Sequence, residues 1–319
     1  MLRTAEFVSP GHPDKLCDRI ADSILDVCLS QDENTRAAIE VMGGHKLISV
    51  TGEITTEAFV NVQETVRKIV GDNCGVQVNI VKQSPEIAGG VDTGGAGDQG
   101  IMIGYACNEN SELIPQEAYL ARSLNKYLYE KHPYDGKTQV TLRDCEIVAL
   151  VASFQLTKTS ELQSDILAWA KEMNLDISKS KIHVNPAGEW NVGGFDADTG
   201  VTGRKLAVDN YGPRIPIGGG AFSGKDSTKV DRSGAYMARR IAVDYLKKYQ
   251  ASEVFVELAY AIGVAEPVQA TAIVDGKEME VQGYDLTPNG IIKALELKKP
   301  IFEVTAQWGH FGNGFNWDK

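Results

Sequence analysis

The chain has 319 residues, of which 43% are hydrophobic and 24% are charged, a composition typical of a globular protein with two or three compact units. The net charge of −11 argues against nucleic acid as a partner, and five widely spaced cysteines without a CxxC pair argue against a disulfide framework or a structural zinc site. There is no apolar signal region and no run of membrane-spanning length, so we expect a cytoplasmic protein without a membrane partner.

The hydrophobic pattern predicts strand pairs that alternate with helices about three times. The first helix begins at Pro13, because proline suits the first helical position. The later elements are expected at these places: strand 47–51, a helix with apolar residues Val62, Val66 and Ile69, strand 76–81, a glycine-rich loop at 89–98, helix 116–129, strands 138–142 and 146–153, helix 161–174, a helix after Asp231, strands 254–260 and 269–274, and helix 288–297. Paired strands favour an α+β class, with helices covering one face of mixed sheets.

A basic, glycine-rich run at 218–232, with the sequence GGGAFSGKDSTKVDR, predicts an anion site. It leads into a helix whose predicted cap is Asp226 or Ser227. Lys225 and Lys229 then lie near the positive end of the helix dipole, where cations are unfavourable unless an anion binds. A phosphate at this position would reverse that effect, because amides and lysines would converge on it.

The same run nearly matches a Walker A loop, since Gly219, Gly224 and Lys225 have the required spacing. Asp226 stands where a serine or threonine would bind magnesium, and two prolines upstream make a poor strand. We therefore reject a P-loop and retain a polyphosphate as the ligand. The alternative interpretation is a flexible surface loop that happens to be basic.

Other charged residues stand beside glycines or in the first turns of elements. Asp14 at the start of the first helix would by itself only compensate the dipole, and His12 could be a cap or a packed histidine. Glu53 ends a strand and is ordinary alone. The cations that together suggest a phosphate site are Lys137, Arg204, Lys205, Lys225 and Lys229. Asp14 and Asp231 are candidate magnesium ligands, because Mg²⁺ typically takes one or two carboxylates plus phosphate oxygens.

These motifs, in this order, resemble those of S-adenosylmethionine synthetases, also called methionine adenosyltransferases. The matching segments are GHPDK at 11–15, GEITT at 52–56, KQSPEI at 82–87, GAGDQG at 95–100, KTQVT at 137–141, TGRK at 202–205, GGGAFSGKD at 218–226, KVDRS at 229–233, YAIGVAEP at 260–267 and GHFG at 309–312. The resemblance implies three similar domains of mixed sheet and helices about a pseudo-threefold axis. It places them near 1–87, 95–193 and 194–319, with strands exchanged between domains as a possibility.

The resemblance also implies a reaction, in which the methionine sulfur attacks C5′ of ATP and tripolyphosphate leaves, to be hydrolysed to pyrophosphate and phosphate. A thioether needs no general base, so the site should mainly stabilise the charge of the leaving group. By motif, His12 would assist departure of the C5′ oxygen, and the five cations would cradle the polyphosphate.

The remaining roles also follow from the resemblance alone. The ATP positions are Asp135, Trp190, Asp198 and Asp231, and the methionine positions are Glu53, Gln83, Asp98 and Lys229. Trp190 suits stacking on adenine, and Asp98 suits the methionine ammonium group. Asp14 would hold one of two Mg²⁺ ions per site, and Glu40, placed before the second strand, would hold K⁺.

The implied partners are ATP, methionine and a second copy of the chain, in a homodimer that shares its active sites or in a dimer of dimers. Two other functions stay open. A catalytically inactive homologue would bind nucleotide without reaction, although no cradle residue has been lost. A P-loop-like kinase is disfavoured by Asp226 and the prolines upstream.

Overall fold

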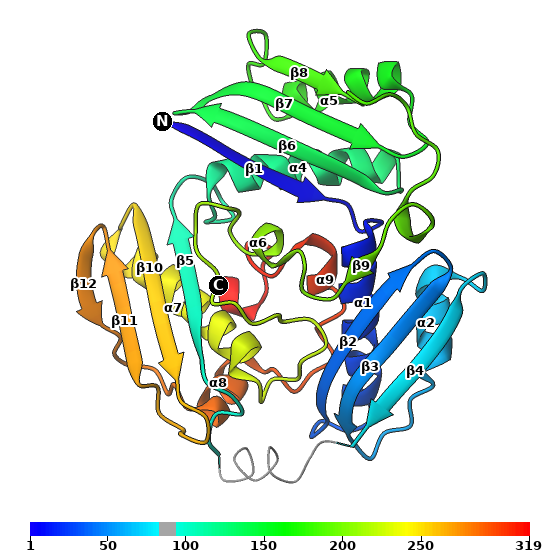
Figure 1. Ribbon diagram of the computed structural model, residues 1–319. Coiled ribbons are helices and arrows are strands. Elements are labelled where there is room, and N and C mark those ends of the chain that lie inside the picture. Colours follow the sequence, from blue (N-terminus) through cyan, green and yellow to red (C-terminus); the bar gives the residue numbers. More distant parts are fainter. Residues whose placement is uncertain (83–93) are drawn as a thin grey trace.

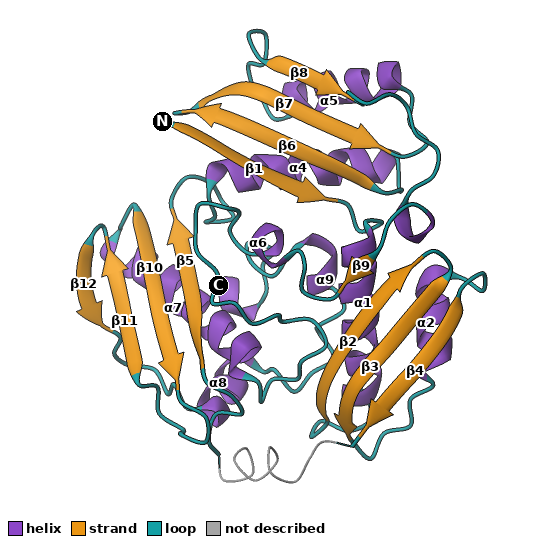
Figure 2. Ribbon diagram, viewed as in Figure 1, coloured by secondary structure: helices purple, strands orange, loops and turns teal. Residues whose placement is uncertain are grey.

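Three four-stranded sheets stand around the middle of the molecule, each with helices packed on one face (Figures 1 and 2). The structure is a computed structural model, and it describes residues 1–82 and 94–319. In the described part of the chain, no helix has the length and apolar character needed to span a bilayer.

The sheets belong to three units with similar element order. The first unit contains α1 (Pro13–Leu29), β2 (Arg36–Gly44), β3 (Leu47–Thr55), α2 (Val62–Val70) and β4 (Gly75–Val81). The second contains α4 (Gln116–Lys131), β6 (Gly136–Arg143), β7 (Glu146–Phe154), α5 (Thr159–Glu172) and β8 (Lys181–Val184). The third contains α7 (Val230–Tyr249), β10 (Glu253–Tyr260), β11 (Gln269–Val274), β12 (Lys277–Glu280) and α8 (Pro288–Leu295). Short helices α6 (Leu206–Asp209) and α9 (Thr305–Trp308) lie among them.

The strand that precedes the first helix of each unit is donated to a different unit. β1 (Leu2–Val8) pairs with β6 of the second unit, and β5 (Gly100–Cys107) pairs with β10 of the third. β9 (Gly200–Val201) pairs with β2 of the first unit. The three donations close a ring, so each sheet is completed by a strand from elsewhere in the chain. The prediction of a three-domain α+β fold is confirmed.

The first two units share their strand directions. In each, a hairpin (β2–β3 or β6–β7) is followed by a helix and a strand parallel to the second hairpin strand, as expected for a crossover connection. The third unit differs in that β12 returns directly as an antiparallel neighbour of β11. Its sheet is therefore antiparallel throughout.

Helix α1 begins at Pro13, as predicted, and is buried on nearly all sides. His12 is its N-cap, because the Nδ1 atom accepts a hydrogen bond from the Asp14 backbone N–H at 3.1 Å. Its apolar side chains pack in the core, but Asp14, Asp18 and Asp22 are buried as well. Buried carboxylates need hydrogen-bond partners, and this helix finds them in loops that come from distant parts of the chain.

Two local predictions were wrong. The N-cap of α7 is Lys229, without a side-chain cap, rather than Asp226 or Ser227. Asp226 instead accepts hydrogen bonds from the backbone N–H groups of Ala37 and Thr228, which fixes it before the helix begins. Glu40 lies inside β2, itself the second strand, rather than before it.

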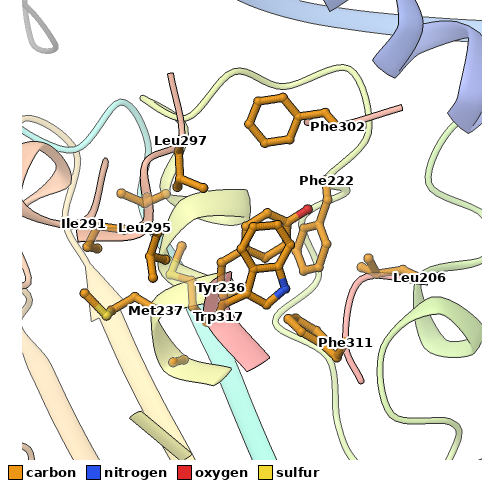
Figure 3. Packing of buried hydrophobic residues seen from close by; sticks show 14 of the residues in the cluster. Leu206, Phe222, Tyr236, Met237, Ile291, Leu295, Leu297, Phe302, Phe311 and Trp317 are labelled. Carbon is orange, nitrogen blue, oxygen red and sulfur yellow. The ribbon is translucent and has the colours of Figure 1, made fainter. Parts of the chain in front are cut away.

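An aromatic cluster fills the centre of the molecule (Figure 3). Tyr236 and Trp317 stack with ring centroids 3.9 Å apart, and Tyr211 stacks on Phe311 at 4.6 Å. Phe222 of the basic run packs edge-on against Tyr236 and is only 5% exposed. The basic run is therefore anchored in the core, which is inconsistent with a flexible surface loop.

Candidate active site

The first group of predicted residues surrounds the N-terminus of α1. Asp14 is 1% exposed and lies against the loop 201–205, hereafter the first cation loop. Its carboxylate accepts a hydrogen bond from the Val201 N–H at 2.9 Å and pairs with Lys205 at 2.5 Å and with Arg204 at 3.6 Å. Although burial opposes ionisation, Lys205 and the Val201 N–H hold the pKa of Asp14 below its ordinary value.

His12 is a neutral hydrogen-bond donor in this group. Burial and the charges of Lys205 and Lys137 lower its pKa to about 3. Because Nδ1 accepts the Asp14 N–H, the proton of the neutral ring is on Nε2. His12 can therefore donate one hydrogen bond to an anion without itself carrying charge.

The predicted nucleotide positions lie beside His12. Lys137 is the second residue of β6 and pairs in register with Val8 of β1, four residues before His12. Asp135 accepts the Gly194 N–H at 3.0 Å, and burial raises its pKa although that hydrogen bond and Lys137 oppose the shift. Asp198 accepts the Thr199 N–H at 2.7 Å and acts electrostatically on both His12 and Asp135.

Trp190, which belongs to the second unit, lies near Lys137. Its Nε1–H donates to the Ser153 Oγ at 3.0 Å, and the indole is half-buried. Ser153 is the register partner of Lys137 across β6 and β7, so the indole lies one strand away from that lysine. An aromatic face held in this way is available for stacking.

The second group lies on residues 218–229 of the basic run, hereafter the second cation loop, and at the start of α7. Lys225 pairs with Asp231 at 2.6 Å, and Lys229 pairs with Asp226 at 2.5 Å. The pairs keep two lysines at the N-terminal end of a helix, where they would otherwise oppose the dipole. Both lysines are partly buried.

One of the predicted methionine positions, Glu53, lies near the second group. Glu53 of β3 is opposite Ala38 of β2, and Ala38 forms a bridge with Lys225. Successive strands are about 4.8 Å apart, so Glu53 and Lys225 stand roughly 10 Å apart at the backbone. Asp98 is exposed and caps the Gln99 N–H shortly before β5. Gln83 falls in 83–93, outside the described residues, as does most of the glycine-rich loop.

Both cation loops are attached to the same edge of β2, which brings the two groups together. Thr202 of the first loop exchanges hydrogen bonds with Val41, and Gly224 of the second accepts the Ile39 N–H at 3.1 Å. The loops also touch, because a Cβ added to Gly203 would be 2.5 Å from the Ala221 Cβ. Glu40 lies between these attachment points and is influenced by the charge of Lys225. The four predicted cations of the two loops, Arg204, Lys205, Lys225 and Lys229, thus lie along one strand, whereas Lys137 lies on β6.

The residues present fit magnesium only together with a phosphate ligand. Across 1–82 and 94–319, no three His, Cys, Asp or Glu side chains converge as a metal cage. Asp14 and Asp231 instead offer one carboxylate each, paired with Lys205 and Lys225 respectively. A single carboxylate completed by phosphate oxygens and water is the usual protein environment of Mg²⁺.

Sequence reasoning missed the residues that hold the two loops in place. Asp226 was noted as a helix cap and as the wrong residue for a Walker motif, whereas it ties the second cation loop to β2 and pairs with Lys229. Asp22 and Arg232 form a fully buried, bidentate pair beneath the same loop. The sequence shows that aspartates recur every four residues along α1, but their hydrogen-bond partners lie up to 277 residues away in the chain.

Comparison with protein families covers nearly all of the chain. Residues 1–85 match the S-adenosylmethionine synthetase N-terminal domain, residues 93–190 match the central domain, and residues 192–319 match the C-terminal domain. These matches agree with the resemblance of the motifs and with the three-unit fold. The chain therefore belongs to the S-adenosylmethionine synthetase family, the methionine adenosyltransferases, which form S-adenosylmethionine.

Proposed function

We propose that the chain makes S-adenosylmethionine from ATP and methionine with the whole tripolyphosphate as the leaving group. The observation that carries this proposal is the pair of cation loops aligned on one edge of β2. Their cations alternate with carboxylates, and none of them is arranged as a nucleophile–base pair. Such a site suits a reaction in which charge develops on a long phosphate chain.

In the proposed step, a sulfur lone pair forms the S–C5′ bond, and the electrons of the C5′–O5′ bond pass to tripolyphosphate. No proton has to be removed from the thioether. The Nε2–H of neutral His12 donates to the departing oxygen. Each lysine or arginine at 4 Å from a phosphate charge contributes about 4 kcal/mol at an effective dielectric constant of 20, although such contributions do not add fully.

Asp14 and Asp231 are proposed as the residues that hold two Mg²⁺ ions, and Glu40 as the residue that holds K⁺. Bound Mg²⁺ would neutralise phosphate charge and orient the chain. Asp135, Asp198 and Trp190 are assigned to the nucleoside, and Glu53, Gln83, Asp98 and Lys229 to methionine.

We further propose a homodimer in which two chains pack their open sheet faces and share each active site. Large apolar side chains on these faces support it: Met42 of β2, Val81 of β4 and Ile101 of β5 are each more than half exposed. Hydrophobic residues that gather on one surface commonly mark an interface.

The test is rapid-quench analysis of the chain with ATP, methionine, Mg²⁺ and K⁺. We expect S-adenosylmethionine and tripolyphosphate to appear together on the enzyme, before pyrophosphate and phosphate. ATP binding without product would support an inactive homologue, and transfer of the γ-phosphate to an acceptor would support a kinase.

A variant refines this test. Lys225→Ala should lower kcat by about 100-fold or more while changing methionine binding little, because the lysine stabilises charge that develops only in the transition state. Lys181→Ala, at an exposed lysine on the edge strand β8, is the matched control. Equal losses of kcat and methionine affinity for Lys225→Ala would contradict a role at the leaving group.

A further inference from the structure

Helix α1 carries an aspartate at every fourth position, and each one receives a backbone N–H from a distant segment. The four are Asp14, Asp18, Asp22 and Asp26. Residues four apart lie on the same side of a helix. Their donors are Val201, Gly203, Gly224 and the pair Phe302 and Glu303, at distances of 2.8–3.1 Å. The helix thus holds three separate segments of the chain by their amides.

The two middle aspartates make the same contact with the two cation loops. Asp18 accepts the Gly203 N–H at 2.8 Å, and Asp22 accepts the Gly224 N–H at 2.8 Å. The glycines have nearly equal backbone angles, φ +80° and +82°. The next residue is a proposed phosphate-binding cation in each case, Arg204 in one loop and Lys225 in the other.

Both glycines are closely confined. A Cβ at Gly203 would be 2.5 Å from the Ala221 Cβ, and one at Gly224 would be 2.1 Å from the Ile39 carbonyl oxygen. The positive φ already favours glycine at these positions. Close packing fixes the position of each glycine, and the hydrogen bond to aspartate fixes the orientation of the peptide group on its N-terminal side. The cation is the residue that follows the glycine.

We propose that Asp18 and Asp22 are positioning residues for the reaction, which set the two cation loops at a fixed separation by holding the backbone N–H of the glycine that precedes a cation in each loop. The proposal rests on the proposed function of the two loops. One rigid helix then serves as the common reference for both halves of the phosphate cradle.

The surroundings of each aspartate suit this role. Asp22 is fully buried and also forms a bidentate pair with Arg232, whose Nη1–H donates to the Lys225 carbonyl oxygen at 3.0 Å. The peptide before Lys225 is held as well, because its Gly224 carbonyl oxygen accepts the Ile39 N–H at 3.1 Å. Asp18 is 3% exposed, and burial raises its pKa to about 8, so an asparagine is a close mimic of its neutral form.

Asp26 provides a matched control on the same helix. It too accepts backbone N–H groups, from Phe302 and Glu303, and burial raises its pKa to about 7. The segment that it holds carries none of the proposed phosphate-binding cations. Loss of Asp26 should therefore weaken the fold locally without disturbing the cradle.

The experiment compares Asp18→Ala, Asp18→Asn and Asp26→Ala by steady-state kinetics and by amide hydrogen exchange of the full chain. For Asp18→Ala we expect kcat to fall by about 100-fold, since small misplacements of catalytic groups cost this much, with the KM for methionine within about threefold. Exchange should accelerate in 199–206 but not in 221–228. Asp18→Asn should restore both measurements, and Asp26→Ala should change only exchange near 300–305.

Asp22→Ala extends the test to the second loop, where exchange should accelerate in 221–228 and not in 199–206. Inorganic tripolyphosphate with Mg²⁺, measured by calorimetry, should bind more weakly to Asp18→Ala than to the parent chain. An unchanged kcat or unchanged exchange in 199–206 would overturn the proposal, as would failure of Asp18→Asn to restore them. If the parent chain made no S-adenosylmethionine, the proposed function would fail, but the exchange and tripolyphosphate measurements would still decide the positioning role.

Discussion

His12 and Asp14 are two residues apart and nearly fully buried, yet His12 is neutral and Asp14 is ionised. Burial and two nearby cations keep His12 neutral, whereas the same cation Lys205 keeps Asp14 ionised. The arrangement places one hydrogen-bond donor and one carboxylate beside the first cation loop. Which group is charged follows from the neighbours of each residue and not from its type alone.

Replacing His12 should change how stability depends on pH. The folded pKa of about 3 lies below the unfolded value of 6.5, so below pH 6.5 the unfolded chain takes up a proton that the folded chain does not. The stabilisation is complete above pH 6.5 and is lost as the pH falls toward 3. At pH 5 the loss is about 2 kcal/mol.

The variant His12→Asn keeps a capping side chain and lacks this titration. Urea unfolding at pH 7.5 and pH 5 should show a smaller loss of stability for the variant than for the parent chain. Parallel losses in the two proteins would show that His12 titrates normally in the fold. Other buried groups, such as His310, are common to both proteins and cancel.

Gly224→Ala should destabilise the chain and reduce activity. The added Cβ meets the Ile39 carbonyl oxygen at 2.1 Å in a backbone conformation that alanine adopts with strain. We expect a loss of about 2–4 kcal/mol in urea unfolding. Gly219→Ala is the control, because Gly219 has φ +106° but open space around its Cβ position. Equal losses for the two variants would show that the clash with Ile39 contributes nothing.

At the scale of elements, the sequence predicted the helices better than the strands. The helix starting at Pro13, the helix near 116–129 and the helix expected at 288–297 had clear periodicity and appear within a few residues of their expected places. β5 was missed because every residue after Ile101 is buried, so that it shows no alternation, and β9 because it has only two residues. β2 does alternate at Ala37, Ile39 and Val41, but the glycines that end it obscured the pattern.

Most of the predicted cations could be found from the sequence, because a cation next to a glycine is a local signal. The residues that support them carry no such signal. The roles of Asp18 and Asp22 depend on Gly203 and Gly224, about 200 residues later in the chain, and only the folded structure brings these pairs together. Local pattern can therefore predict residues that would touch a ligand, whereas residues that support them depend on tertiary contacts.

The buried pair between α1 and α7 should be costly to break. Arg232 and Asp22 are both 0% exposed, and the guanidinium also contacts Tyr236 and Thr305. Arg232→Met leaves an unpaired buried carboxylate and should destabilise the chain by about 3–5 kcal/mol. Adding Asp22→Asn to that variant should recover part of the loss in urea unfolding. If the double variant is as unstable as the sum of the single changes, the two residues are not energetically coupled.

At the scale of the whole molecule, the open sheet faces are expected to meet those of a second chain. Val81→Lys combined with Ile101→Lys places two charges on these faces and should convert the proposed dimer into a monomer in sedimentation velocity. Activity should fall with it, if the active sites are shared. Leu167→Lys is the control, because Leu167 is similarly exposed but lies on helix α5. A dimer that survives the double change would place the interface elsewhere.

The ring of donated strands has a consequence for how the chain is made. β1 leaves the ribosome some 130 residues before its partner β6, a delay on the order of ten seconds of synthesis. β5 waits in the same way for β10. Only β9, two residues long, is donated backward, to a unit already synthesised. The second and third units can therefore fold as they emerge onto strands that have already been made, and the first unit is completed by a two-residue strand made between them.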